Sequence, residues 1–251
     1  MITVASNGGG TDSKAMLIGC VQKGIPVDLI LFADTGGEKP HTYADLFDFG
    51  LWLKKNGMPE ITIVSSTGKT LEQDCLDRHA LPSIAYGFKT CSQRFKIQPQ
   101  EKFMNNWIKA HLAWKAGEKI TRLIGYEAGE ERRVKEFESD KYINRYPLIE
   151  WGWDRAKCIE VIKAEGLPQP GKSACFFCPS SKAGEVRWLA RNHPDLFNRA
   201  VAMEKNAKLT TIKGLGRDYS WEEMVKFKDA QLELLDNDWS TAEVPCGCYD
   251  G

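Results

Sequence analysis

The strongest constraint on the fold lies at the amino terminus, where an apolar β-rich run leads into a glycine-rich segment and then into a helical pattern. The run covers Ile2 to Ala5, the segment reads SNGGGTDS, and the helical pattern covers Lys14 to Gln22. Glycines allow the backbone to approach an anion closely, and the free amides at the start of a helix donate hydrogen bonds to phosphate oxygens. A tight turn between a strand and a helix could use the same residues without a ligand. The pattern predicts a strand–loop–helix unit suited to phosphate binding.

The chain that follows alternates between apolar β-rich runs and helical patterns. Further β-rich runs cover Val27 to Phe32, Ile61 to Val64 and Ile120 to Ile124, and helical patterns cover Tyr43 to Lys55, Gln100 to Lys115 and Arg155 to Ala164. This alternation predicts an α/β, Rossmann-like fold, in which crossover helices flank a parallel sheet. Polar helices at Ala183 to Arg191, Asp195 to Lys208 and Trp221 to Leu235 predict a helical carboxyl-terminal extension. We expect a nucleotide-binding domain over residues 1–180, with residues 181–251 packed on the same domain.

Composition argues against several classes of protein. The chain has 251 residues with 34 Lys plus Arg against 34 Asp plus Glu, so its formal charge of zero lacks the basic signature of a protein that coats nucleic acid. The first residues do not form a signal peptide and no run of 18 apolar residues occurs, so we expect neither secretion nor a membrane span. Eight cysteines in such a chain predict a reducing, cytoplasmic location, where clustered thiols bind metal or carry out redox chemistry.

The segment Gly9-Gly10-Thr11-Asp12-Ser13 resembles the PP-loop, SGGxDS, of the N-type ATP pyrophosphatases and their relatives in the adenine nucleotide alpha hydrolase superfamily, which share a HUP-type fold. The other common glycine-rich nucleotide motifs fail on spacing. The resemblance implies that the chain binds ATP and Mg²⁺, and that the loop holds the pyrophosphate while the α phosphate is attacked. It assigns nucleotide binding to Ser6, Gly8, Gly9, Gly10, Thr11 and Ser13, and catalysis to Asp12. A lysine is frequent at the position of Thr11, and Lys14 lies nearby.

Four further segments resemble the phosphoadenosine phosphosulfate (PAPS) reductase family, in the family's order. They are Phe32-Ala-Asp34-Thr35-Gly36, Thr90-Cys91-Ser92-Gln93-Arg94-Phe95-Lys96-Ile97, Ile124-Gly125-Tyr126 with Glu130 to Arg133, and Pro147-Leu-Ile-Glu150-Trp151. The resemblance implies catalytic roles for Asp34, Arg94 and Lys96, and nucleotide contacts for Thr35, Gly36, Gly125, Arg132 and Arg133. We expect Arg94, Lys96, Arg132 and Arg133 to converge on the glycine loop, because guanidinium and ammonium groups bind phosphate or sulfate oxygens.

The pair Cys175-Phe-Phe-Cys178 has a spacing that lets two thiolates reach one metal ion or cluster. Spacing alone does not separate zinc from iron–sulfur. By resemblance to the iron–sulfur adenylyl-sulfate reductases, Cys91, Cys175 and Cys178 match three of the four ligands of a [4Fe-4S] cluster, with Thr90 in place of the fourth. Two arrangements complete such a cluster: Cys158, on the preceding helix, supplies the fourth thiolate, or one iron stays open. A structural Zn²⁺ site is the alternative to a cluster. Cys20 and Cys75 are interpreted as core thiols.

The tail Glu243-Val-Pro245-Cys246-Gly247-Cys248-Tyr249 resembles the Glu-Cys-Gly-Leu-His tail of sulfonucleotide reductases, whose cysteine is a mobile nucleophile. The resemblance implies that Cys246 is a catalytic nucleophile that reaches the nucleotide site. A passive chain end with incidental thiols is the alternative.

Together these motifs favour an enzyme that activates its substrate with ATP. An intact glycine loop favours release of pyrophosphate and an adenylate intermediate for sulfur transfer, with help from the cluster. A PAPS or adenylyl-sulfate reductase is the second hypothesis, and a non-catalytic nucleotide-sensing protein, of phage or defence type, is the third. The expected partners are an adenine nucleotide, an acceptor that is a small molecule or a nucleic acid, a sulfur donor protein and a second copy of the chain, with no membrane partner.

Overall fold

The computed structural model describes residues 1–66, 68–82, 84–85, 88–134 and 139–226. Its central element is a five-stranded parallel sheet with the order β3-β2-β1-β6-β7. The strands are β1 (Thr3–Ser6), β2 (Leu29–Asp34), β3 (Ile61–Ser65), β6 (Ile120–Leu123) and β7 (Tyr142–Arg145). A separate antiparallel hairpin consists of β4 (Ile84–Ala85) and β5 (Phe88–Lys89). The parallel sheet confirms the predicted α/β, Rossmann-like fold.

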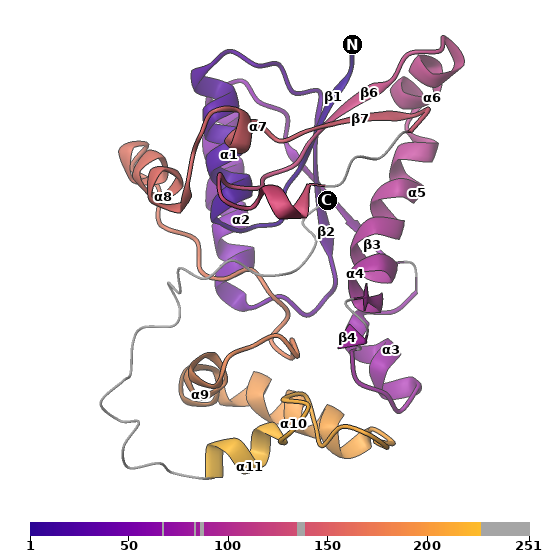
Figure 1. Cartoon of the computed structure of the whole chain (residues 1–251), viewed down its shortest axis with the longest axis vertical. Coiled ribbons are helices and arrows are strands. Elements are labelled where there is room, and N and C mark those ends of the chain that lie inside the picture. The colour runs from indigo at the N-terminus through magenta and orange to yellow at the C-terminus, as the bar shows by residue number, and fades with distance from the viewer. Residues whose placement is uncertain (67, 83, 86–87, 135–138, 227–251) are drawn as a thin grey trace.

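Helices connect the strands and continue beyond the sheet (Figure 1). In the described residues they are α1 (Thr11–Gln22), α2 (Pro40–Lys55), α3 (Leu71–Asp77), α4 (Thr90–Ser92), the π-helical turn η1 (Gln93–Ile97), α5 (Gln98–Asn106), α6 (Ile108–Lys115), the 3-10 turn η2 (Glu131–Arg133), α7 (Pro147–Glu150), α8 (Arg155–Ala164), α9 (Ala183–Asn192), α10 (Pro194–Asn206) and α11 (Trp221–Lys226). None of the helices in this part of the chain is long and apolar enough to cross a membrane.

The two faces of the sheet bury different helices, because alternate residues of each strand point to opposite faces. On one face, Ala5 and Ile30 belong to a core with the buried residues of α1 and α8. On the other face, Val4 and Leu31 belong to a core with buried residues of α5 and α6. Figure 1 shows the same division, with α1, α2 and α8 on one side of the strands and α5 and α6 on the other. Both faces are therefore covered, as an all-parallel sheet requires.

The strand order reverses between β1 and β6. From β1 the chain runs outward through β2 and β3, and it then returns to the other side of β1 to form β6 and β7. In open α/β sheets, ligands bind in the crevice at the carboxyl ends of the strands where such a reversal occurs. Here the glycine loop follows β1 and Gly125 follows β6 by two residues, so both border this crevice.

Gly125 brings the chain after β6 directly against the first turn of α1. A Cβ atom added at Gly125 would lie 3.0 Å from the backbone nitrogen of Ser13 and 3.1 Å from the carbonyl carbon of Asp12. Both of these atoms belong to the backbone, so neither can rotate away as the end of a side chain could. The absence of a side chain at Gly125 therefore permits the close contact between β6 and the start of α1.

The carboxyl-terminal helices α9, α10 and α11 gather at the end of the molecule opposite the amino terminus (Figure 1). Their buried residues, which include Leu189, Leu196 and Trp221, share a core with Leu71 of α3 and with Phe177. The helical extension predicted from the sequence is present and packs on the part of the chain that carries the cysteine pair. The division into domains at residue 180 stays a prediction.

Two expectations about the elements were incomplete. The single helix expected over Gln100 to Lys115 is two helices, because Trp107 adopts an extended backbone conformation between α5 and α6. The fifth strand, β7, was not predicted. Its alternation of half-buried and exposed residues covers only four positions, which is too short for a clear strand pattern. Hydrogen bonding to β6 at the edge of the sheet stabilises this segment as a strand.

We predict that Gly125→Ala destabilises the fold, because the new methyl group meets backbone atoms at the start of α1. The expected loss in the free energy of unfolding is about 1–3 kcal/mol, the usual cost of overpacking, measured by urea denaturation. Gly50→Ala is the matched control, since a Cβ there meets no atom within 4 Å and alanine favours the helical conformation. Equal stability of the Gly125→Ala variant and the parent chain would contradict the proposed contact.

Candidate functional site

The glycine loop adopts a tight conformation that only small residues allow. Gly9 has a φ of 71°, in the left-handed region, and an added Cβ would lie 3.1 Å from the Thr42 methyl group and 3.3 Å from the Phe32 ring. The backbone nitrogen of Gly9 donates to Asn7 Oδ1 at 3.0 Å, and Ser13 Oγ donates to the carbonyl of Gly10 at 3.2 Å. The loop is therefore held in one shape at the amino end of α1.

A distant segment of the chain crosses over the loop. Ser173 Oγ donates a hydrogen bond to the carbonyl oxygen of Gly8, and Gln169 Nε2 donates to Thr11 Oγ1 at 2.7 Å. We call residues 169–175 the strap. Because Ser173 lies two residues before Cys175, the strap connects the glycine loop to the candidate metal ligands. The hydroxyl groups of Ser173 and Thr11 lie at the loop as a result.

Lys14 does not face the glycine loop. Its side chain is only 2% exposed, its Nζ forms an ion pair with Asp45 of α2, and Nζ also donates to the carbonyl of Pro168 at 3.0 Å. The ammonium group is thus already neutralised in the interior between α1 and α2. Lys14 therefore does not replace the lysine that is frequent at the position of Thr11.

Asp12 lies in a buried polar cluster that the sequence motifs did not predict. Arg155, the first residue of α8, donates to Asp12 Oδ1 and lies 3.8 Å from Glu127 Oε2. Ligand atoms of Asp12, Glu127 and Cys158 all lie within 4.8 Å of one another, and all three residues are buried. Burial raises the pKa of Glu127 above its ordinary value, and the nearby charge of Arg155 opposes that rise. The arrangement brings two carboxylates together at the amino end of α1.

The end of β2 supplies further polar groups to the same edge of the sheet. Asp34 Oδ1 accepts hydrogen bonds from the backbone nitrogen of Gly36 at 2.7 Å and from the Tyr43 hydroxyl at 2.8 Å. Gly36 has a φ of 71° and an added Cβ would lie 2.4 Å from the Thr70 methyl group. Thr35 Oγ1 lies 3.1 Å from Cys175 Sγ. The Asp-Thr-Gly turn therefore contacts the cysteine pair.

Cys91, Cys175 and Cys178 line one pocket. The pocket has a volume of about 400 Å³, including space open to solvent, and Thr35, Lys96 and Phe177 also line it. Lys96 Nζ lies 3.7 Å from Glu38 Oε1, and Glu38 pairs with Cys175 through an isolated β-bridge. All three cysteines are half-buried. The structure therefore brings together three of the four predicted metal ligands.

Cys158 was predicted as the fourth metal ligand, and the structure argues against that role. It does not line the thiol pocket, and it is completely buried in the core formed by α1 and α8. Burial raises the pKa of its thiol far above the ordinary range, and the nearby carboxylate of Asp12 raises it further. Burial likewise raises the pKa of Cys20 to about 12 and that of Cys75 to about 11. These three buried thiols are protonated and unreactive at neutral pH.

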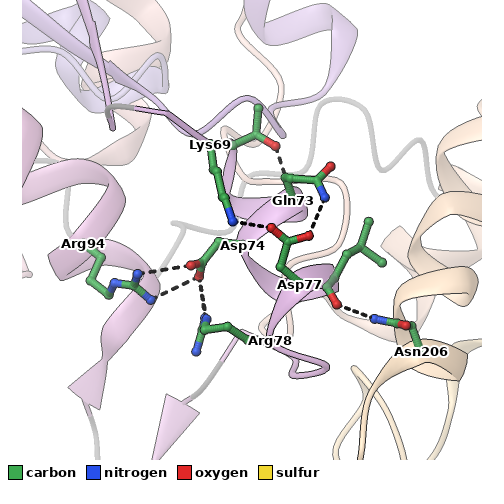
Figure 2. Close-up of polar contacts among 9 residues, drawn as sticks. Lys69, Gln73, Asp74, Asp77, Arg78, Arg94 and Asn206 are labelled. Carbon is green, nitrogen blue, oxygen red and sulfur yellow. Dashed lines mark hydrogen bonds and ion pairs between the residues drawn. The ribbon is translucent and has the colours of Figure 1, made fainter.

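Of the four basic residues expected to converge on the loop, three pair with acidic residues elsewhere and the fourth is exposed. Arg94 forms two hydrogen bonds to Asp74 of α3 (Figure 2), and Lys96 pairs with Glu38. Arg133 pairs with Glu130 and lies over the Tyr126 ring, 4.1 Å from its centroid, and Arg132 is exposed. Arg94 and Lys96 therefore belong to the surroundings of the cysteine pocket, whereas Arg133 belongs to the turn that follows β6.

Sequence reasoning missed Arg155, Glu127 and Ser173. Arg155 is separated from Asp12 by 143 positions, so no local spacing links the two residues. The sequence contains only a weak signal for Ser173. A hydroxyl group two residues before a cysteine pair can lie near the ligand that the pair binds. Cys246, predicted as a nucleophile, lies outside the described residues.

We predict that Glu127→Gln stabilises the chain more, relative to the parent, at pH 7 than at pH 4. The folded-state pKa of Glu127 is raised, so the parent loses folding free energy as rising pH ionises this carboxyl group. The amide of the variant remains neutral and avoids that loss. Urea denaturation of both chains at several pH values measures the difference. A difference in unfolding free energy that is constant or shrinks toward pH 7 would contradict the raised pKa.

No family model matches the chain. An uncharacterized protein of Methanocaldococcus jannaschii is 24% identical over 238 residues, which cover 91% of this chain and 54% of that protein. The chain therefore spans about half the length of this relative. Among solved structures, the chain is similar to PAPS reductase from Candida auris in a phosphate complex. The identity is 20%, the TM-score is 0.48, and the match covers 67% of this chain and 75% of that chain.

Proposed function

We propose that the chain is a PP-loop enzyme of the PAPS reductase type that binds ATP, releases pyrophosphate and activates an acceptor as an adenylate for sulfur transfer. In the first step, an acceptor oxygen attacks the α phosphorus and the bond to the bridging oxygen breaks, so that pyrophosphate leaves. A sulfur nucleophile then displaces AMP from the activated acceptor. The observation that carries the proposal is that one segment, the strap, contacts both the glycine loop and the thiol pocket. The strap contacts the glycine loop through Ser173 and the Asp-Thr-Gly turn through Cys175.

The glycine loop supports binding of a polyphosphate. Its backbone approaches the crevice without side chains at Gly8, Gly9 and Gly10, and it ends on the first turn of a twelve-residue helix. Amide groups and the helix dipole at this position stabilise negative charge. Since Lys14 is paired with Asp45, amide donors and a metal ion would provide most of the stabilisation of the leaving pyrophosphate.

Asp12 and Glu127 fit a magnesium ion. Mg²⁺ prefers one or two carboxylates together with water and phosphate oxygens, and carboxylate oxygens of these two residues lie within 4.8 Å of each other. Cys158 belongs to the same cluster, but its protonated thiol is a poor partner for a hard cation. Magnesium bound here would neutralise charge on the phosphates. Arg155 would hold the two carboxylates in place, since it pairs with both.

The donor set of the thiol pocket suits an iron–sulfur cluster better than tetrahedral zinc. Zinc–sulfur bonds of about 2.3 Å put the sulfur atoms about 3.8 Å apart in a tetrahedron. In the described part of the chain, the sulfur atoms of Cys91, Cys175 and Cys178 do not form a group within 4.8 Å of one another. A [4Fe-4S] cluster binds each thiolate on a different iron atom, which suits a wider set. The cluster would bind or position sulfur. Cys246 remains the proposed nucleophile.

We predict that Asp12→Asn and Ser13→Ala each reduce ATP-dependent pyrophosphate release at least about 100-fold, because both residues lie where the loop meets α1. A coupled pyrophosphate assay with Mg²⁺, together with mass spectrometry of the products, measures the effect. Asp28→Asn is the control, since Asp28 accepts a hydrogen bond from the Thr3 backbone at the opposite ends of the strands. Unchanged turnover in both loop variants would refute the assignment, and melting temperatures must stay near that of the parent chain.

We predict that protein purified without oxygen is brown and holds about four iron atoms per chain. Cys91→Ser, Cys175→Ser and Cys178→Ser should each lose iron, because these residues line the pocket. Cys158→Ser is the matched control and should keep its iron, because Cys158 lies in a different core. Metal analysis of the purified variants measures the content. Stoichiometric zinc without iron in the parent chain would refute the cluster.

A further inference from the structure

A second pocket adjoins the thiol pocket and contains two arginines. Its volume is about 380 Å³, including space open to solvent, and its lining includes Arg78, Arg94, Thr90 and Cys91. Cys91, Leu71 and Pro82 line both pockets, so Cys91 stands at their shared boundary. Arg78 follows the last residue of α3 and Arg94 belongs to η1, so two elements each contribute one guanidinium group to the same pocket.

One carboxylate holds the two guanidinium groups together (Figure 2). Arg94 donates from Nη1 and Nη2 to the two oxygens of Asp74, at 3.1 Å each, and Arg78 donates from Nε at 2.9 Å and from Nη2. The Asp74 side chain is only 11% exposed. Burial raises the pKa of this carboxyl group, but the hydrogen bonds from both arginines outweigh that effect and bring it below its ordinary value. Asp74 is therefore ionised at neutral pH and keeps both arginines in place.

The arrangement leaves positive charge and hydrogen-bond donors unused. Two guanidinium groups share one carboxylate, so the cluster carries a net charge of about +1. Each guanidinium has five N–H donors, and Asp74 accepts from only part of each set. Within the described part of the chain, their remaining donors have no protein partner. The side chains of Arg78 and Arg94 are 50% and 45% exposed, so a ligand in the pocket can reach them.

We infer that Arg78 and Arg94 form a subsite for a tetrahedral oxyanion, a phosphate or sulfate group carried by a substrate. Guanidinium groups bind such anions through paired N–H donors, and a fixed pair loses little conformational freedom on binding. Thr90, whose side chain carries a hydroxyl donor, lines the same pocket. An anion held there would lie next to Cys91, and hence beside the thiol pocket. The subsite would orient the substrate toward the thiols and does not depend on how the glycine loop uses ATP.

Titration with inorganic phosphate or sulfate at constant ionic strength tests the subsite, with the arginine Nε–H signals followed by NMR. The signals of Arg78 and Arg94 should shift together with one dissociation constant, and Arg78→Gln should weaken the binding reported by Arg94 about tenfold. Arg78→Lys should weaken phosphate binding less, because lysine keeps the positive charge but lacks the paired N–H donors of a guanidinium group. Arg199→Gln is the matched control, since Arg199 makes a similar two-bond pair with Glu72 away from the pocket.

Repeating the titration with ATP present identifies the source of the anion. Unchanged phosphate binding at Arg78 and Arg94 with saturating ATP assigns the subsite to a second substrate, whereas competition assigns it to a nucleotide phosphate. Absence of shifts at both arginines, or equal weakening by Arg199→Gln, would overturn the subsite. Circular dichroism of each variant shows whether it is folded, and if Arg78→Gln does not fold, Arg78→Lys provides the comparison. Loss of pyrophosphate release in the loop variants leaves this result unaffected, so the two proposals fail separately.

Discussion

The close contact between the end of β6 and the start of α1 governs the geometry of the candidate site. Gly125 makes this contact possible, because a Cβ atom there would lie 3.0 Å from the backbone of Ser13. The contact lies where the strand order reverses, so it sets the width of the crevice between the glycine loop and the turn after β6. It also positions Glu127, two residues after Gly125, close to Asp12. The paired carboxylates therefore follow from the packing of one glycine against one helix.

The strap then joins two sites that are distant in sequence. Ser173 contacts the glycine loop and Cys175 contacts Thr35, so the three successive residues 173–175 reach both the glycine loop and the thiol pocket. The core shared by α9, α10 and α11 with Phe176 and Phe177 supports the strap from the other side. The helical extension thus stabilises the position of the cysteine pair. The strap would therefore contact both a substrate group activated at the glycine loop and the thiol pocket, through Ser173 and Cys175.

Electrostatics divides the cysteines and the cations into two groups. Cys20, Cys75 and Cys158 are buried, and desolvation raises the pKa of each thiol so that it stays protonated at neutral pH. The three cysteines of the thiol pocket are half-buried. Among the cations, Lys14 is neutralised by Asp45, whereas Arg78 and Arg94 share one acid and face an open pocket. Positive charge is therefore available beside the thiols.

The sequence by itself determined the α/β class, most of the sheet and helix positions, and the glycine loop, because strand and helix periodicities and the Gly-Gly-Thr-Asp-Ser spacing are local features. It also predicted that Cys91, Cys175 and Cys178 act together, although only the fold brings Cys91 to the other two. The tertiary structure alone decided that Cys158 faces the core, that Lys14 pairs with Asp45, and that Arg155 holds Asp12 and Glu127. These are contacts between residues far apart along the chain, and their partners depend on how helices pack on the sheet. No local spacing encodes that packing, so the direction of each side chain could only be learned from the folded molecule.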